Sequence, residues 1–233
     1  MKKEYWFVMI VYIIAQLSSI VGVPILLVAF DMGIAQATAW WIFGSFAVAV
    51  LLTLLLLRKE MTEKKRDLQA PIGISLFWAI AGIFLAFFAQ TASGMIEQAI
   101  GIDPGSENTQ HITSLIEQAP MMIVATALFG PILEEIIFRK IIFGSLYKRF
   151  NFFLSALISS AIFGLAHFEL EHLLLYTAMG LTFAFLYVRT KRIWVSIVAH
   201  VAMNSIVVLM QVVFKDEIEE MLEHAPAFIG GFL

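Results

Sequence analysis

Apolar residues fill long stretches of this chain, and short polar stretches separate them. A helix that crosses a bilayer needs about 20 consecutive, mostly apolar residues. In the first stretch, Gly22 and Pro24 are expected to kink the helix or to end it early. We therefore predict an all-α fold, a polytopic transmembrane helical bundle of about seven spans, over residues 5–30, 38–57, 71–95, 119–147, 150–168, 172–188 and 193–214.

Two polar segments lie outside these runs, and neither predicts a further domain. Segment 97–118 mixes glycine and proline with polar residues, so we expect an irregular external connection there. After Lys215, apolar residues recur at helical spacing, which predicts a short amphipathic helix at the outer interface. We expect residues 1–233 to form a single integral membrane domain.

Composition and charge agree with a membrane protein. The chain is 61% hydrophobic and 14% charged, against about 45–50% and about 25% for soluble domains. It contains no cysteine, which excludes disulfides, iron–sulfur clusters and thiolate nucleophiles or metal ligands.

Basic residues gather on one predicted side. They precede the first run and follow the second, fourth and sixth runs, and only Lys215 breaks the pattern. Because the basic side of a membrane protein is cytoplasmic, we expect a multi-pass protein of the cell membrane. Its N-terminus is expected in the cytoplasm and its C-terminus outside.

The run over 119–147 carries three charged residues, Glu134, Glu135 and Arg139. A charged side chain at the bilayer centre costs about 2.5–3.5 kcal/mol on insertion scales, so it indicates function. Glu135 and Arg139 are four residues apart and can neutralise each other, which predicts a structural role. Glu134 shares its helix face with Phe138 instead, so its carboxylate is available to a site.

A proline lies just before this group. Pro131 removes one backbone N–H and leaves the carbonyl of Ala127 without its helical donor. We expect the helix to break or bend here. If Pro131 begins the inner segment, Glu134 lies near a helix N-terminus, where the helix dipole favours a carboxylate.

The fifth predicted helix carries a histidine on a face of small residues. Ala156, Ser160 and Gly164 recur at four-residue spacing, which allows another helix to approach closely. His167 continues that face. Phe163 precedes it by four residues, so its ring can lie over the imidazole and help to exclude water.

His200 and Asn204 share a face of the seventh predicted helix. At 1.5 Å per residue from the cytoplasmic edge, these two, Glu134 and His167 lie at overlapping depths. Each histidine alone is more simply a hydrogen-bonded core residue. Together, the four side chains predict a polar cavity between helices four, five and seven.

A carboxylate and an imidazole in one space can position and deprotonate a water, and two further donors can hold an oxyanion. These are the parts of a hydrolase without a protein nucleophile. An intramembrane aspartate dyad is excluded, because every aspartate falls in a predicted loop or the tail. No His-Glu-x-x-His zinc pattern occurs either.

Three patterns follow one another on successive hydrophobic helices: Glu134-Glu135-x-x-x-Arg139, Phe163-x-x-x-His167 and His200-x-x-x-Asn204. Within residues 119–207 they resemble the motifs of the CAAX prenyl protease and bacteriocin-processing family of intramembrane endopeptidases, also called the Abi family. The resemblance implies that Glu134 is the general base and that His167 orients the water. It further implies that His200 and Asn204 form the oxyanion hole, while Glu135 and Arg139 support the site.

Metal dependence is a separate question. Glu134, His167 and His200 could bind zinc, whose catalytic sites use three protein ligands and a water. We favour a metal-free site that requires no cofactor, because asparagine is a poor zinc ligand and a good oxyanion donor. His172, with Glu169 and Glu171, could extend a metal site, although an external polar turn is simpler. His111 and His224 are expected to be solvated.

Two other functions stay open. A non-catalytic membrane scaffold or bacteriocin-immunity protein would keep this fold and bind a partner. A proton-coupled transporter would also use buried glutamate and histidine, but the chain lacks paired broken helices in matching halves. For the protease we expect a peptide or membrane-associated protein substrate in the lipid bilayer, and no nucleic acid.

Overall fold

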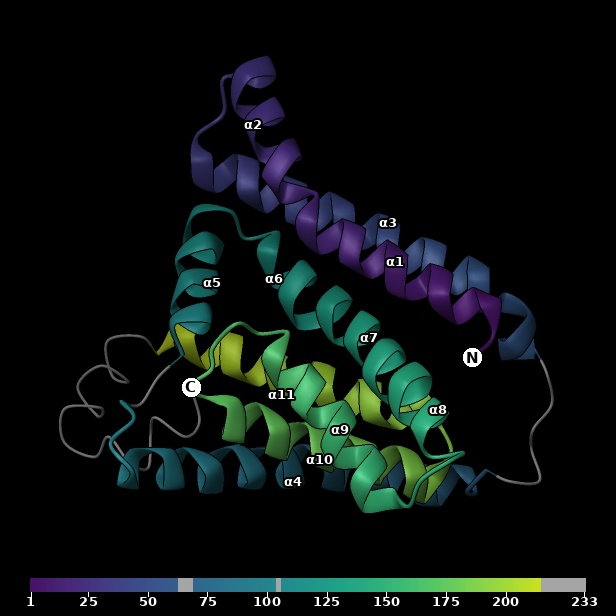
Figure 1. Ribbon diagram of the computed structural model, residues 1–233. Coiled ribbons are helices and arrows are strands. Elements are labelled where there is room, and N and C mark those ends of the chain that lie inside the picture. Colours follow the sequence, from purple (N-terminus) through teal and green to yellow (C-terminus); the bar gives the residue numbers. More distant parts are fainter. Residues whose placement is uncertain (63–68, 104–105, 215–233) are drawn as a thin grey trace.

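The structure is a computed structural model that describes residues 1–62, 69–103 and 106–214. Within these ranges every regular element is a helix and no strand occurs, so the all-α prediction is confirmed. Figure 1 shows the helices as a bundle. They are α1 (Lys3–Leu17), α2 (Ser19–Phe30), α3 (Ile34–Thr62), α4 (Ile72–Ala99), α5 (Glu107–Gln118), α6 (Met122–Val124), η2 (Ala125–Phe129), α7 (Gly130–Glu134), η3 (Glu135–Phe143), α8 (Gly144–Leu146), α9 (Phe152–Leu165), α10 (Leu173–Thr190) and α11 (Ile193–Val213).

Each of the seven predicted ranges contains helix, but the count of seven spans is not confirmed. Four described helices, α3, α4, α10 and α11, are long and apolar enough to cross a membrane, and the bent pair of α1 and α2 brings the number to five. The helix α9 is apolar but has only 14 residues. The run from α6 to α8 is divided into short α and π segments.

The predicted kink in the first run lies at Ser18, where α1 and α2 meet at 44°. Gly22 lies one turn further along, and a Cβ added there would overlap the ring of Trp41. The same indole donates a hydrogen bond of 2.9 Å to Ser18 Oγ. The bend is therefore held by packing against α3, with Pro24 inside α2.

The helix does not end at Pro131, so of the predicted break or bend, the break does not occur. The backbone stays helical from Met122 to Leu146, with π-helical turns in η2 and η3 on either side of α7. The N–H of Gly130 donates to the carbonyl of Ala125, five residues back. The π-helical turns thus keep the backbone helical although Pro131 has no N–H to donate. Glu134 therefore does not lie beside a free helix N-terminus.

Segment 106–118 differs from the predicted irregular connection, because α5 occupies most of it. Ser106 caps this helix by accepting a hydrogen bond of 3.0 Å from the N–H of Thr109. The apolar residues Leu115 and Ile116 are buried in a cluster beside α3 and α6. An amphipathic helix therefore covers one end of the bundle.

Two layers flank the run over 122–146 (Figure 1). The helices α1 and α3 lie side by side on one flank, and α4 packs against α10 on the other. Between α9 and α10 the approach is close: a Cβ added to Gly180 would lie 2.6 Å from the Cβ of Ser160. Ala156 and Ser160 are fully buried, which confirms the predicted small-residue face.

Ion pairs join the basic residues at one end of the bundle. Glu60 lies 3.0 Å from Lys2 Nζ and 3.1 Å from Lys140 Nζ. These contacts place the N-terminus and the end of η3 together, which agrees with the prediction that the basic residues lie on one side of the membrane. Which side is cytoplasmic stays a prediction, and the predicted tail helix and His224 lie outside the described residues.

Candidate active site

All four side chains predicted to share a cavity line one cavity of about 350 Å³. Glu134 comes from α7, His167 from the turn after α9, and His200 and Asn204 from α11. More helices line the cavity than the three predicted ones, because lining residues also come from α1, α3, α4, α5 and α10. The geometry therefore brings the predicted residues together within a larger enclosure.

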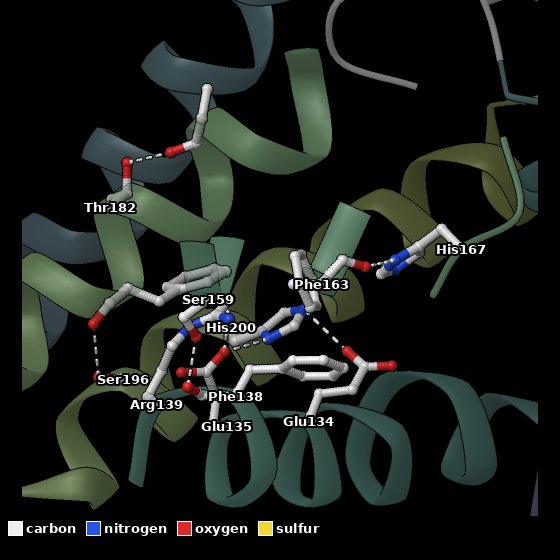
Figure 2. Close-up of polar contacts among 12 residues, drawn as sticks. Glu134, Glu135, Phe138, Arg139, Ser159, Phe163, His167, Thr182, Ser196 and His200 are labelled. Carbon is white, nitrogen blue, oxygen red and sulfur yellow. Dashed lines mark hydrogen bonds and ion pairs between the residues drawn. The ribbon is translucent and has the colours of Figure 1, made fainter. Parts of the chain in front are cut away.

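Glu134 extends from the helix into this space. Its side chain is 16% exposed, and Oε2 lies 3.8 Å from His200 Nε2. Figure 2 shows its carboxylate directed toward His200, with His167 on the far side of Phe163. Glu134 thus faces the cavity, whereas Glu135 is fully buried.

Glu135 contacts two polar side chains, and the sequence spacing predicted one of these contacts. Its Oε1 lies 3.3 Å from Arg139 Nη2, as expected, and 3.0 Å from His200 Nδ1. Both Glu135 and Arg139 are fully buried. The guanidinium also lies 4.4 Å from the ring centre of Phe163, a cation–π contact that helps to hold a buried charge.

The proton positions at His200 follow from these contacts. With Glu135 ionised, Nδ1 carries the proton that is donated to Oε1. Neutral His200 then has a lone pair on Nε2, toward Glu134. It becomes a donor to the cavity only when doubly protonated, and both N–H groups then face a carboxylate.

His167 is oriented by the end of α9 and by a ring from α10. Its Nδ1 lies 2.8 Å from the carbonyl oxygen of Phe163, so Nδ1 is the donor and Nε2 keeps a lone pair. Phe163 contacts the imidazole as predicted, with ring centres 4.6 Å apart, but the rings are T-shaped at 71° and not stacked. Tyr176 stacks there instead, with ring centres 4.0 Å apart and planes at 23°.

Asn204 has an uncommitted amide on the cavity wall. It is partly exposed and lines the same space as His200. No described residue forms a hydrogen bond with its side chain. The amide is thus available to a ligand.

A second polar group lies where α5 meets the turn between α9 and α10. Glu169 accepts hydrogen bonds from Tyr176 Oη at 2.5 Å and from the Asn108 N–H at 2.8 Å. Ser106 Oγ also donates to it, at 2.8 Å. Burial raises the pKa of the Glu169 carboxyl, but these donors outweigh burial and hold that pKa below its ordinary value.

The other polar residues near this turn do not join the Glu169 group. His172 Nδ1 lies 2.9 Å from Glu97 Oε2, and Glu171 is exposed. His111 is exposed, as expected, but it belongs to α5 and lines the cavity. Sequence reasoning did not predict the contributions of Glu97 and Tyr176.

The donor set does not fit a metal in this arrangement. Among the described residues, no group of three histidine, aspartate or glutamate side chains converges as metal ligands, and that includes Glu134, His167 and His200. Metal dependence itself stays untested.

Comparison with known proteins shows the family of this chain. A family model described as "Type II CAAX prenyl endopeptidase Rce1-like" matches residues 116–206, which include all three sequence patterns. The chain belongs to this family of membrane proteases.

Two relatives extend the likeness. The chain is 48% identical to "Putative membrane peptidase YdiL" of Bacillus subtilis (strain 168), with 99% of both proteins covered. It is 31% identical to "Membrane-embedded CAAX protease MroQ" of Staphylococcus aureus (strain USA300), over 72% of this chain and 70% of that protein. No solved structure matches the chain.

Proposed function

We propose that this protein is an intramembrane endopeptidase that hydrolyses a peptide bond with a water activated by Glu134 and His167. The observation that carries the proposal is the position of Glu134. Its carboxylate faces a cavity that also holds His167, His200 and Asn204, while its neighbour Glu135 is buried against Arg139.

In the first step, water donates one proton to Glu134 and a hydrogen bond to the Nε2 lone pair of His167. Its oxygen attacks the carbonyl carbon of the substrate and forms a tetrahedral oxyanion. General-base catalysis of this kind contributes about 10²–10⁴-fold. The second step breaks the C–N bond as Glu134 returns the proton to the leaving nitrogen.

The oxyanion receives hydrogen bonds from the Asn204 amide and from Nε2 of doubly protonated His200. Glu135 accepts the other imidazole proton, and its contact with Arg139 fixes the carboxylate. One oxyanion donor is worth about 10²–10³-fold in kcat. This account requires no metal and no covalent intermediate.

The substrate class proposed is a peptide or a membrane-associated protein segment. To find one, membrane proteins of cells with the wild-type chain are compared by mass spectrometry with those of cells with Glu134→Ala. A precursor that accumulates only in the mutant is then incubated with purified protein in lipid nanodiscs.

In that assay, Glu134→Gln is expected to lower kcat by at least about 10²-fold, because its amide cannot accept the water proton. Glu171→Gln, a substitution of an exposed glutamate, serves as the matched control and keeps full activity. Full cleavage by Glu134→Gln rejects the mechanism. A cellular function that survives Glu134→Gln favours a non-catalytic scaffold.

A further inference from the structure

The helix α4 forms a wall of the cavity that the proposed mechanism does not use. Gln90, Gly94 and Glu97 line the cavity from this helix, at spacings of four and three residues. Such spacing places them on one helix face. They lie outside residues 116–206, the range matched by the family model.

Gln90 is the unusual member of this wall. It is 4% exposed, and its Oε1 has no hydrogen-bond partner among the described residues. Buried polar atoms are normally paired, so an unpaired acceptor needs an explanation. The side chain lines the cavity but this oxygen is itself closed off from solvent, so the terminal amide must turn before Oε1 can accept an N–H from a bound peptide.

Apart from histidines and tyrosines, the ionisable side chains that line the cavity are acidic. Glu97, Asp103 and Glu134 line the cavity, and none of its described lining residues is lysine or arginine. The nearby cation Arg139 is fully buried, pairs with Glu135 and does not line the cavity.

The two outer carboxylates differ in their surroundings. Glu97 is 2% exposed and accepts hydrogen bonds of 2.9 Å from His172 Nδ1 and from the N–H of Leu175. Asp103 is exposed where the segment before α5 meets the cavity. Asp103 is therefore the more accessible of the two carboxylates to an entering cation.

We propose that α4 is a substrate-binding wall that selects an otherwise apolar peptide segment bearing a lysine or arginine. The cationic group lies toward Asp103 and Glu97, and the Gln90 amide turns so that Oε1 accepts a main-chain N–H of the same segment. Apolar lining residues such as Ile112, Leu115 and Val208 contact the flanking side chains. This inference rests on the proposed endopeptidase function and names its substrate class.

The physical reason for the selectivity is the partial enclosure of the cavity, in which Glu97 is 2% exposed. Carboxylates attract a cation more strongly where solvent is partly excluded. A lysine at membrane depth requires such a partner. An acidic residue at the same position would be repelled and would lose its hydration.

The test measures binding apart from cleavage. Full-length protein carrying Glu134→Gln is placed in phosphatidylcholine nanodiscs, which carry no net charge. Three fluorescein-labelled decapeptides of alanine and leucine, with lysine, glutamine or glutamate at one central position, are titrated by fluorescence anisotropy. Empty nanodiscs measure binding to lipid.

The lysine peptide is expected to bind at least about fivefold more tightly than the glutamine peptide, which is about 1 kcal/mol. The glutamate peptide is expected to bind most weakly. Adding Asp103→Asn is expected to make the affinities for the lysine and glutamine peptides nearly equal. Equal affinities for the three peptides, or a ratio that Asp103→Asn leaves unchanged, overturn the charge selectivity.

Gln90→Met keeps a side chain of similar length and removes the acceptor. It is expected to weaken the binding of all three peptides by about fivefold, the effect of one hydrogen bond, and to leave the ratios of their affinities unchanged. Thr91→Val is the matched control, because Thr91 Oγ1 is also buried without a partner but does not line the cavity. Equal affinities in these two variants reject the role of Gln90.

Size-exclusion profiles and melting temperatures check that each variant is folded. Because an unpaired acceptor is removed, Gln90→Met is expected to melt no lower than the parent protein. Absence of cleavage by the wild-type protein would reject the proposed function without altering these binding ratios, so the two failures are distinguishable.

Discussion

His200 and Glu135, which are 65 residues apart in the sequence, are joined by a buried contact of 3.0 Å between Nδ1 and Oε1. The same carboxylate oxygen lies 3.3 Å from Arg139 Nη2. One buried oxygen therefore links a residue that faces the cavity to the cation behind it. In the proposed mechanism, Glu135 therefore both pairs with Arg139 and accepts the Nδ1 proton of His200.

Removal of Arg139 alone should destabilise the protein strongly. Arg139→Met leaves the Glu135 carboxylate buried without its cation, and breaking such a pair costs about 3–5 kcal/mol. The double variant Glu135→Gln/Arg139→Met removes both charges and should regain most of this loss. Unfolding in a mild detergent measures the effect. Additive losses would contradict it.

A matched control uses an ion pair at the end of the bundle. Lys2 has a side chain that is 46% exposed and pairs with Glu60. Exposed pairs contribute about 0–1 kcal/mol. Lys2→Met should therefore change the stability much less than Arg139→Met.

The same double variant separates stability from catalysis. With Glu135→Gln, His200 loses the anion that accepts its Nδ1 proton, so the imidazole is no longer held in place as an oxyanion donor. We expect kcat to fall by at least about tenfold at equal folded fraction, since loss of an oxyanion donor costs about 10²–10³-fold. The measurement is single-turnover cleavage of the accumulated precursor. Unchanged kcat would show that His200 does not act through Glu135.

Sequence spacing predicted the Glu135–Arg139 pair because the two residues are neighbours on one helix. The contact of Glu135 with His200 joins distant helices, so local periodicity does not predict it. The π-helical turns around Pro131 were missed for a similar reason. Wider turns depend on tertiary support, such as the hydrogen bond of 2.6 Å from Ser159 Oγ to the Phe138 carbonyl.

Some parts of the structure have a recognisable sequence signal and others have none. Apolar run lengths predicted the helical class, but they did not predict α5, whose apolar face is narrow and whose composition is polar. Gln90 is a polar residue within the predicted run 71–95, a signal that could have marked it. The stack of Tyr176 on His167 has no such signal, because tyrosines are common in membrane helices.

The stacked ring provides a prediction about His167. Tyr176→Phe keeps the stack and removes only the hydroxyl group that donates to Glu169. Tyr176→Leu removes the ring and lets the imidazole turn. We expect Tyr176→Leu to lower kcat by about tenfold or more with little change in KM, since small misplacements of a catalytic group are costly. Equal kcat values in the two variants would exclude an orienting role.

The hydrogen bonds of Glu169 make the attachment of α5 depend on pH. Its pKa is lowered in the folded protein, so its stabilising contribution is present above its ordinary value of 4.5 and is lost as pH falls through the folded value. The difference in melting temperature between wild type and Glu169→Gln should therefore be largest near neutrality and shrink below that value. Glu171→Gln, at an exposed neighbour, should show no such pH dependence. A difference that grows toward acid would contradict the assignment.

The contact between α9 and α10 allows a test of packing. A Cβ at Gly180 would lie 3.0 Å from the backbone Cα of Ser160, which cannot move without shifting α9. A Cβ at Gly82 would instead meet the flexible end of Leu186 at 2.5 Å, and one at Gly44 would meet nothing within 4 Å. Overpacking costs about 1–3 kcal/mol, whereas alanine in an open helical site gains up to about 1 kcal/mol over glycine. Gly180→Ala should therefore lose more stability than Gly82→Ala, and Gly44→Ala should be neutral or stabilising.

The same variant should also affect activity. Because Ser160 and His167 belong to one segment, Gly180→Ala should reduce cleavage. A fully active Gly180→Ala protein of unchanged stability would show that the two helices do not pack this closely.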